Sequence, residues 1–463
     1  MKKRALFLSL LLLLLSACSL FTDKEELPHD LPSILDSDTL RVLTLNTSTS
    51  YFIYRDQPMG YHYDMIRAFC NYHGLVPEII LAPGIASMVQ MLQEGAGDVI
   101  AYHVPVTREY RDSVTYCGLQ QINHQVLVQR AMRGDTLLRD VTDLIGKRVT
   151  VTTGSRYHQR MIHLNEELGG GILIETAGSD SIVTEDLIRM VSRGEIAYTV
   201  ADNDLARFNK TYFRNLHTDL QISFDQRSSW VVRNDTPILA DSLNSWFESK
   251  SAEPVFMRIM KRYFEETKGF YEEDRFSYSE ILGPGVISPF DNYFRKEGAR
   301  QGIDWRLLAA LAYQESTFRT EESSWAGAVG LMGLMPATAA SLGITSDQLY
   351  DPEHNIRVGT QYLKNLIALF SSVGDRSEEI KLALAAYNGG IGHISDARAL
   401  AEKYEADKNV WEGNVERFVQ LKSLEQYYTD PVCRNGYFRG DETINYVREV
   451  IARWEQYRQS VKE

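Results

Sequence analysis

Hydrophobic and polar positions follow two different patterns along the chain, and the change between them predicts two folded parts. In the first part, short runs rich in β-branched residues alternate with stretches of helical periodicity. We expect strands at 41–45, 78–81, 148–152 and 198–201, and helices at 63–73 and 85–94. Alternation of strands and helices is typical of an α/β domain.

A segment rich in turn residues separates this part from the rest of the chain. Glycines, prolines and a charged run interrupt the apolar periodicity between residues 268 and 288. Such residues mark turns and linkers. We therefore expect an α/β domain at 38–267, a linker at 268–288 and a second domain at 289–463.

The helix expected at 304–318 carries a carboxylate on its apolar face. Leu308, Leu311, Glu315 and Phe318 share one stripe at helical spacing. Because burial disfavours the charged form of an acid, the pKa of Glu315 should be raised toward neutrality, as a general acid requires. The alternative is a solvated surface glutamate, which a small change of helix phase would produce.

Two later segments suit a site around Glu315. The run 324–338 is glycine-rich, apolar and uncharged, which fits the wall of a close-packed groove better than a solvated loop. Further on, an apolar helix ends in Asn388 and two glycines. This C-terminal signal also brings polar groups and backbone beside a site.

Together these segments resemble the lytic transglycosylase domain of the lysozyme-like superfamily. The motifs stand in the family's order: Glu315-Ser-x-Phe, Ser324, Gly330-Leu-Met-x-Leu-Met-Pro, Ala385-Ala-Tyr-Asn-Gly and Glu442-Thr-x-x-Tyr-Val. The resemblance implies a mainly α fold with Glu315 as the sole catalytic acid and base. It also implies a sugar groove lined by Ser324, Met335, Tyr387, Asn388 and Tyr446. Gly333 stands where the family usually has Gln, which puts one hydrogen bond to the sugar in question.

Only one carboxylate is placed for the chemistry, whereas ordinary glycosidases use two. Glu321 and Glu322 are near in sequence, but they stand in a polar turn, where solvated charge is their expected role. One acid suffices if the sugar's own C6 hydroxyl attacks, which gives a 1,6-anhydro product and consumes no water. Two alternatives stay open: a muramidase that uses water, and a receptor whose second domain only binds glycan.

The first half resembles the periplasmic amino-acid-type solute-binding proteins, whose fold is a two-lobed α/β clamp. The shared phrases are Gly60-Tyr-His-Tyr-Asp-Met, Leu92-x-x-Gly-x-x-Asp, Asp143-Leu-Ile-Gly-Lys-Arg-Val and Gly194-Glu-Ile-Ala-Tyr-Thr-Val-Ala-Asp. The resemblance implies that Arg111 binds a carboxylate, that Ser155 completes the anion site and that Asp202 binds an ammonium group. Arg108 competes with Arg111 for the first role. Ser155 could instead be a helix N-cap, and Asp202 a loop cap.

The amino terminus predicts export and a lipid anchor. Basic residues at 2–4 precede an apolar run at 5–15 that is too short to span a bilayer. Leu15-Ser-Ala-Cys18 follows and resembles the lipobox of bacterial lipoproteins, in which the Cys becomes the acylated first residue. A plain secretory signal is the alternative. Ser19 favours the outer membrane, facing the periplasm, and 19–37 reads as a polar tether.

Composition narrows the classes further. The 463 residues are 44% hydrophobic and 24% charged, which fits a globular protein of two or three domains. A net charge of −13 argues against nucleic acid as a partner. Neither the cysteines nor the scattered histidines have metal-ligand spacing, so we expect no metal and no organic cofactor. Cys70 and Cys117 could form a disulfide or remain buried thiols.

The order of lipobox, solute-binding-like domain and transglycosylase-like domain resembles the membrane-bound lytic murein transglycosylase F family over nearly the whole chain. The resemblance implies an enzyme that cleaves the MurNAc–GlcNAc bond of peptidoglycan glycan strands. It further implies that the first domain binds a muropeptide or amino-acid ligand and adjusts catalysis. Such coupling requires that the ligand binds two conformations with different affinity.

Overall fold

The structure is a computed structural model that describes residues 29–177, 184–266, 285–321 and 323–461. These residues fold into two compact units. The first contains the described parts of Met1–Thr44, Ile66–Gln120 and Ser228–Ala252, and the second those of Leu45–Met65, Gln121–Arg227 and Glu253–Glu463. The units therefore cut across the division expected at 268–288, most of which lies outside the described residues.

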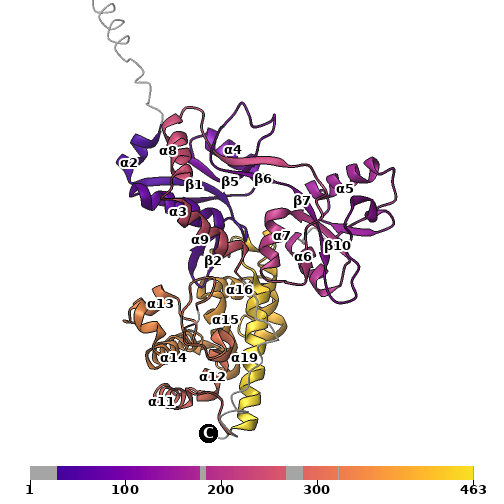
Figure 1. Ribbon diagram of the computed structural model, residues 1–463. Coiled ribbons are helices and arrows are strands. Elements are labelled where there is room, and N and C mark those ends of the chain that lie inside the picture. Colours follow the sequence, from indigo (N-terminus) through magenta and orange to yellow (C-terminus); the bar gives the residue numbers. More distant parts are fainter. Residues whose placement is uncertain (1–28, 178–183, 267–284, 322, 462–463) are drawn as a thin grey trace, which may run out of the picture. The chain divides into compact units, whose positions relative to one another are not determined.

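The first unit is built on a five-stranded sheet. Its strand order is β4-β1-β5-β12-β6, with β1 Thr39–Leu45, β4 Val76–Ala82, β5 Val99–Pro105, β6 Thr115–Asn123 and β12 Gln226–Val232. β1 pairs in parallel with β5, and β12 runs antiparallel to β5. The helices of this unit are α2 Leu31–Ser37, α4 Ile85–Gln93, α8 Pro237–Glu248 and most of α3 Tyr61–His73 (Figure 1). The strands and helices expected at 41–45, 63–73, 78–81 and 85–94 are confirmed.

The end of the expected tether is wrong, because residues 30–37 are part of this fold. Asp30 caps α2 and also accepts hydrogen bonds from the backbone N–H groups of Ile238 and Leu239, at 3.0 and 2.8 Å. Leu31 and Ile34 are buried. The polar composition of the segment gave no sign of α2, a short amphipathic helix that the Asp30 carboxylate links to the start of α8. The remainder of the tether lies outside the described residues.

Cys70 and Cys117 are both buried in the first unit as free thiols. Burial raises the pKa of each thiol to about 12. Thiolate is the reactive form of cysteine, so both side chains act here as small apolar groups of the core. The sequence left open whether Cys70 and Cys117 form a disulfide or remain buried thiols, and in the structure they are buried thiols.

The second unit contains a smaller α/β lobe. β10 Tyr198–Asp202, β7 Gln125–Arg130 and β11 Leu216–His217 form one sheet, and β8 Arg148–Val151 pairs in parallel with β9 Leu173–Thr176. The strands expected at 148–152 and 198–201 are confirmed. Helices cover these sheets: α5 Arg156–Glu167, α6 Thr184–Arg193 and α7 Asn203–Lys210. α9 Glu253–Phe264 packs against α7.

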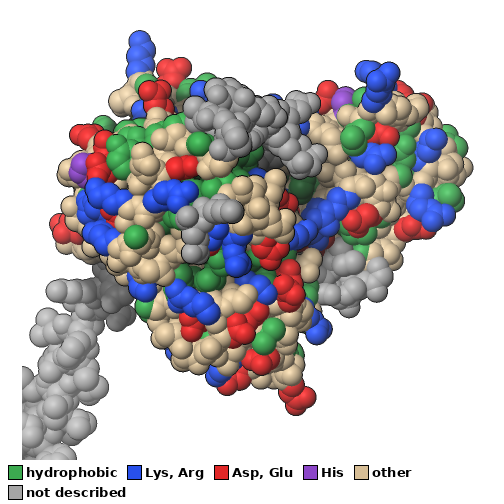
Figure 2. Space-filling model, turned by 90° about the horizontal axis from the view of Figure 1, so that it is seen from below, with side chains coloured by type: hydrophobic (Ala, Val, Ile, Leu, Met, Phe, Trp, Pro, Cys, Tyr) green, Lys and Arg blue, Asp and Glu red, His purple; other side chains and the backbone are tan. Residues whose placement is uncertain are grey.

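The rest of the second unit is helical. Its main helices are α11 Asp291–Gln301, α12 Trp305–Ser316, α13 Pro336–Ser341, α14 Pro352–Leu369, α15 Arg376–Gly389, α16 Ile391–Lys403, α17 Glu416–Leu421, α18 Glu425–Tyr428 and α19 Gly440–Ser460. One apolar core joins them, and α19 packs along α12 and α15 (Figure 1). On the face drawn in Figure 2, cationic and anionic side chains are interspersed, and neither sign covers the face alone.

A β-hairpin also belongs to the second unit. β2 Phe52–Tyr54 and β3 Gln57–Met59 pair antiparallel around a two-residue turn. Both turn residues, Arg55 and Asp56, have left-handed backbone angles, with φ of 48° and 58°. Two left-handed residues suit the right-handed twist of a tight hairpin, although glycine and asparagine adopt them at lower cost.

Candidate active site

Glu315 lies in the last turn of α12. Asp304 caps the start of this helix by accepting a hydrogen bond from the Arg306 N–H at 3.0 Å. Thr317 and Phe318 have φ of 51° and 64°, so the helix stops at Ser316. The expected helix reached Phe318, so it is two residues too long at its C-terminal end. The side chain of Phe318 is nevertheless buried.

The carboxyl group of Glu315 is shielded from water. Its side chain is only 5% exposed, which excludes the alternative of a solvated surface glutamate. Burial raises the pKa of Glu315, while the positive charge of Arg55 and a hydrogen bond from Tyr446 oppose this rise. A carboxyl with a raised pKa keeps its proton closer to neutral pH, as a general acid must.

Two tyrosines from other helices complete the surroundings of this acid. The hydroxyl of Tyr446, on α19, donates to Oε1 of Glu315 at 2.7 Å. The hydroxyl of Tyr387, on α15, donates to the carbonyl of Met332 at 2.7 Å and so fixes the glycine-rich loop. α19 packs against both α12 and α15, so three segments far apart in sequence hold one site.

The glycine-rich loop approaches Glu315 at Gly333. This residue has φ of 56°, and a Cβ atom there would lie 2.0 Å from Oε2 of Glu315. Asn355 holds the same loop: its Oδ1 accepts from the Met332 N–H at 2.8 Å, and its Nδ2 donates to the Val329 carbonyl at 3.1 Å. Glycine at 333 thus gives the carboxyl its space.

The tip of the β2–β3 hairpin fills the space in front of the acid. One terminal nitrogen of Arg55 donates to both oxygens of Glu315, at 3.1 and 3.0 Å, and the other donates to the carbonyl of Gly333 at 2.7 Å. The Arg55 side chain is 10% exposed. In this arrangement the guanidinium covers the carboxyl group of Glu315.

Three further contacts fix the hairpin against the helical part. Asp56 accepts from the backbone N–H groups of Ile391 and Gly392, at 3.0 and 3.1 Å, where α16 begins. Nε2 of His393 lies 3.0 Å from the Ile53 carbonyl. The hydroxyl of Tyr54 donates to Glu442 at 3.4 Å. The docking of the hairpin therefore combines charge, backbone and side-chain contacts.

Glu442 is a second acid at the site, and it is partly buried. It lies one turn before Tyr446 on α19. Burial raises its pKa, opposed by the charges of Arg439 and Arg55, and the negative charge of Glu315 raises it further. Its place in the Glu442-Thr-x-x-Tyr motif was visible in the sequence, but its burial was not.

The structure brings together Glu315, Tyr387 and Tyr446 among the residues expected at the site. Asn388 accepts a hydrogen bond from the Thr443 hydroxyl at 2.6 Å, a contact between α15 and α19. Ser324 is exposed, and its hydroxyl accepts from the Ala328 N–H at 3.0 Å. Met335 is buried at the start of α13. Sequence reasoning missed Arg55, for which the sequence carried no signal.

The residues expected to bind a small ligand are divided between the units. Arg111, like Arg108, is an exposed residue near the turn that follows β5 in the first unit. In the second unit, the hydroxyl of Ser155 caps α5 by accepting from the His158 N–H at 3.1 Å. Asp202 forms an ion pair with Arg156. Both residues of the second unit thus already have partners.

Among the described residues, no group of three or more His, Cys, Asp or Glu side chains is arranged to hold a metal ion. In the same part of the chain, no helix has both the length and the apolar character needed to cross a membrane. Cys18, the expected lipidation site, lies outside the described residues.

Residues 40–266 match the family described as bacterial extracellular solute-binding proteins, family 3, and residues 292–410 match the transglycosylase SLT domain. The fold and the site thus define a two-domain protein: a two-lobed α/β solute-binding domain followed by a helical transglycosylase domain. Glu442 and Tyr446 lie beyond the matched residues of the second domain, although α19 carries both into the site.

Two curated relatives match the chain over most of its length. A protein of Desulfosudis oleivorans is 31% identical over 95% of this chain and 94% of its own, and one of Pseudomonas fluorescens is 29% identical over 95% and 87%. Both are named membrane-bound lytic murein transglycosylase F. The chain belongs to this family.

The solute-binding half also matches solved structures. An ancestral cationic amino acid solute-binding protein is 17% identical, covers 50% of this chain and 99% of its own, and has a TM-score of 0.44. The assignment of the first half rests on the family match to residues 40–266 rather than on this structure.

Proposed function

We propose that Glu315 is the single catalytic acid and base of this peptidoglycan lytic transglycosylase. The observation that carries the proposal is the environment of its carboxyl: 5% exposed, with a pKa raised by burial and a hydrogen bond from Tyr446. A site that only bound glycan would gain nothing from an acid held in this way, because burying a carboxyl without need costs stability.

The reaction requires two proton transfers through the same carboxyl group. Glu315 in its acid form protonates the oxygen of the MurNAc–GlcNAc bond, and the C1–O bond of the MurNAc residue breaks. The C6 hydroxyl of the same MurNAc attacks C1, and the Glu315 carboxylate takes the proton that this hydroxyl loses. The product is a 1,6-anhydroMurNAc end, no water is consumed, and the acid is regenerated.

Glu442 does not provide the second carboxylate of a hydrolase in this proposal. A general base or nucleophile must be ionised, whereas burial raises the pKa of Glu442 and so favours its protonated form. The hydroxyl of Tyr54 donates a hydrogen bond to Glu442. No contact that Glu442 makes with the described residues supports a role in activating a water molecule. We therefore keep the muramidase reaction as the outcome that would contradict the proposal.

The variant Glu315→Gln tests the assignment. It keeps the size and the hydrogen-bonding capacity of the side chain but cannot donate and retrieve a proton, so turnover of purified sacculi should fall by about 10²–10⁴-fold. Glu321→Gln is the matched control, because Glu321 is exposed and lies six positions away. Equal turnover by both variants would reject Glu315.

The hairpin supports a regulatory role for the first half of the chain. Arg55 neutralises Glu315 and covers its carboxyl group, and Asp56 holds the tip against α16. We infer that substrate cleavage requires this tip to leave. A muropeptide or amino-acid ligand would activate the enzyme if it binds the undocked state more tightly.

For such a ligand we propose Arg111 as the partner of a carboxylate group, Ser155 as a further part of the anion site and Asp202 as the partner of an ammonium group. The ion pair of Asp202 with Arg156 means that a ligand's ammonium group would have to compete with a guanidinium for the same carboxylate. Calorimetric titration of the full chain with muropeptides, and with an Arg111→Met variant, tests this site. If the variant bound the ligand as tightly as the wild type, Arg111 would not be part of the ligand site.

The location of the enzyme is the cell envelope, as the membrane-bound name of its relatives implies. We propose that acylated Cys18 anchors it to the outer membrane, with the catalytic domain facing the periplasm. The support is the Leu15-Ser-Ala-Cys18 motif followed by Ser19. Cys18→Ala should move the protein from the outer-membrane fraction to the soluble fraction of a cell lysate, and an unchanged distribution would reject the anchor.

A further inference from the structure

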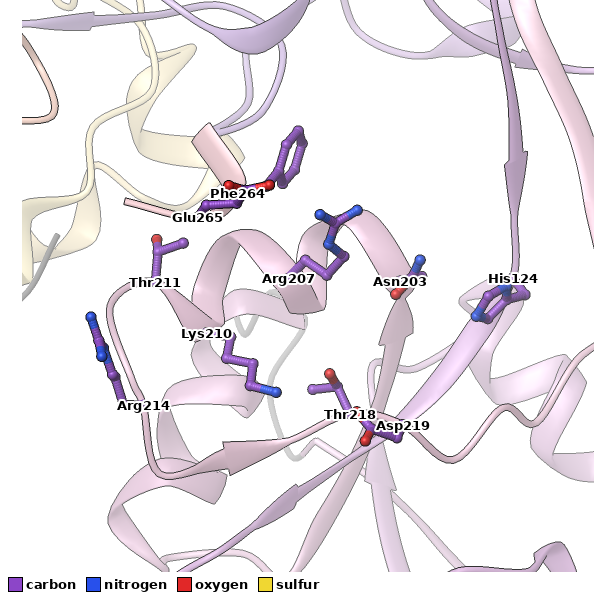
Figure 3. Close-up of a pocket in the computed structure, with 10 residues that line it drawn as sticks. All are labelled: His124, Asn203, Arg207, Lys210, Thr211, Arg214, Thr218, Asp219, Phe264 and Glu265. Atoms are coloured by element: carbon purple, nitrogen blue, oxygen red, sulfur yellow. The ribbon is translucent and has the colours of Figure 1, made fainter. Parts of the chain in front are cut away.

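The second unit contains a cavity that the proposed reaction does not use. It has a volume of about 540 Å³, within the usual range for small-molecule sites. Its walls come from α7, from residues between the end of α7 and Asp219, from His124 and from the end of α9 (Figure 3). None of the residues that contact Glu315, and none of Arg111, Ser155 and Asp202, line it.

The walls of this cavity are rich in cations. Arg207 and Lys210 stand three positions apart on α7 and therefore share one face of the helix. Arg214 follows on the next segment. In Figure 3 the Lys210 side chain extends into the cavity toward Thr218, and it forms no ion pair with any residue that the structure describes.

The same cavity has an apolar side. The guanidinium of Arg207 lies 5.3 Å from the ring centroid of Phe264, which is buried. Stacking on an aromatic ring holds the guanidinium in place and leaves its edge for hydrogen bonds. Thr211 and Thr218 are also buried in the wall. A ligand here would meet both cationic groups and an aromatic ring.

Two carboxylates reduce the positive charge without cancelling it. Asp219 and Glu265 are both exposed at the cavity, and Asp219 also lies 3.4 Å from Nε2 of His217. Three cations against two carboxylates leave the lining itself with one excess positive charge when its histidine is uncharged. Asp204, which does not line the cavity and whose pKa burial raises to about 6, also interacts with Arg207. The chemistry of the site therefore favours an anion over a metal ion or an ammonium group.

We propose that this cavity binds a small organic anion, one that carries a phosphate or a carboxylate group on an apolar body. Arg207 and Lys210 hold the anionic group, since a guanidinium and an ammonium are the usual protein partners of these oxygens. Phe264 contacts the apolar body. The site is separate from the catalytic groove and from the residues proposed to bind a muropeptide or amino acid. It would therefore give the enzyme a second binding site for a small molecule.

Two titrations of the full chain test this proposal and separate the two anions. Inorganic phosphate and citrate are added in separate arms at constant ionic strength, and binding is followed by calorimetry. Saturable binding in either arm is expected, and the arm that binds identifies the group that the cavity prefers.

The variant Lys210→Glu should weaken that binding by at least about tenfold, because it turns an attraction into a repulsion. Lys147→Glu is the matched control: an exposed lysine of the same lobe that lies outside the cavity. Arg207→Met should give a similar loss while the chain keeps its melting temperature. Absence of saturable binding in both arms, or an equal loss in the Lys210 and Lys147 variants, would overturn the proposal.

Discussion

At the scale of single residues, opposing effects set the proton affinity of Glu315. Burial raises its pKa, and the charge of Arg55 and the hydroxyl of Tyr446 lower it again. The docked hairpin therefore does more than block access, because it also favours the ionised form of an acid that must begin the reaction protonated. If the hairpin undocked, the groove would open and the pKa of Glu315 would rise, so the same movement would favour its protonated form.

The first prediction concerns the pH dependence of turnover in Arg55→Met. Without the guanidinium, the ionised form of Glu315 loses an attraction, so its pKa rises further and the acid stays protonated to higher pH. The descending limb of the pH profile, measured on sacculi, should therefore shift toward alkaline pH relative to the wild type. Arg133→Met, at an exposed loop position, should leave the profile unchanged. A shift toward acid pH in Arg55→Met would contradict the electrostatic account.

The second prediction concerns the space beside Glu315. Gly333→Ala places a methyl group against the carboxyl and also strains a left-handed position, whereas Gly343→Ala, at φ of 83° with open space around it, only strains the backbone. Each should cost about 1–2 kcal/mol of stability in denaturant unfolding from the backbone alone. Only Gly333→Ala should also lower turnover strongly. Similar turnover in both variants would show that the contact with Glu315 is unimportant.

At the scale of elements, the β2–β3 hairpin joins the solute-binding sequence to the catalytic groove. Its turn uses two left-handed residues that are not glycine, Arg55 and Asp56. Asn-Gly would form the same turn at lower cost. The presence of Arg and Asp is explained by the contacts that they make with Glu315 and with the start of α16.

The third prediction concerns the replacement of Arg55 and Asp56 by Asn and Gly. The double variant Arg55→Asn, Asp56→Gly keeps the hairpin but removes the contacts that its two turn residues make with Glu315 and with the start of α16. Hydrogen bonds to charged groups contribute about 1.5–3 kcal/mol each. Turnover of sacculi by the full chain should therefore rise by about tenfold or more. A double variant that is no faster than the wild type would mean that the hairpin does not restrain catalysis.

A buried charge cluster supports the hairpin from the helical side. Nζ of Lys422 lies 2.5 Å from Asp396 and 3.0 Å from Nδ1 of His393. Because an ammonium group can only donate, Nδ1 must accept, and Nε2 carries the proton that His393 donates to the Ile53 carbonyl. Burial, together with the Lys422 charge, lowers the pKa of His393 well below its usual value, which keeps the ring in this neutral form.

The fourth prediction concerns the stability of this cluster. Lys422→Met leaves Asp396 buried without its cation, although the backbone N–H groups of Arg434 and Asn435 still donate to it. The free energy of unfolding should fall by about 3 kcal/mol. Lys408→Met breaks an exposed pair with Glu402 and should cost no more than about 1 kcal/mol. Equal losses in the two variants would contradict the role of burial.

At the scale of the whole molecule, periodicity in the sequence was sufficient to predict several of the elements. Alternating runs gave strands such as β1 and β10, and the stripe through Leu311 and Glu315 gave a buried acid on α12. Local patterns predicted these features because each depends on neighbours a few positions away. The helix before Gly389 ended where its glycines indicated.

The docked hairpin could not be predicted in this way. Arg55 and Glu315 are 260 positions apart, and an arginine in a short turn has no local feature that distinguishes it from a solvated one. Glu442 likewise has a distant partner, because the hydroxyl of Tyr54 that contacts it is 388 positions away in the sequence. Long-range charge pairs are decided by tertiary packing, so the sequence predicted the acid but not the arginine that contacts it.

The mass of the glycan released from purified sacculi tests the central claim most directly. Cleavage by a single acid and base predicts fragments that end in 1,6-anhydroMurNAc, each lighter by one water than the hydrolysed fragment, and their absence with Glu315→Gln. Fragments with reducing ends, or anhydro fragments that still form without the Glu315 carboxyl, would contradict it.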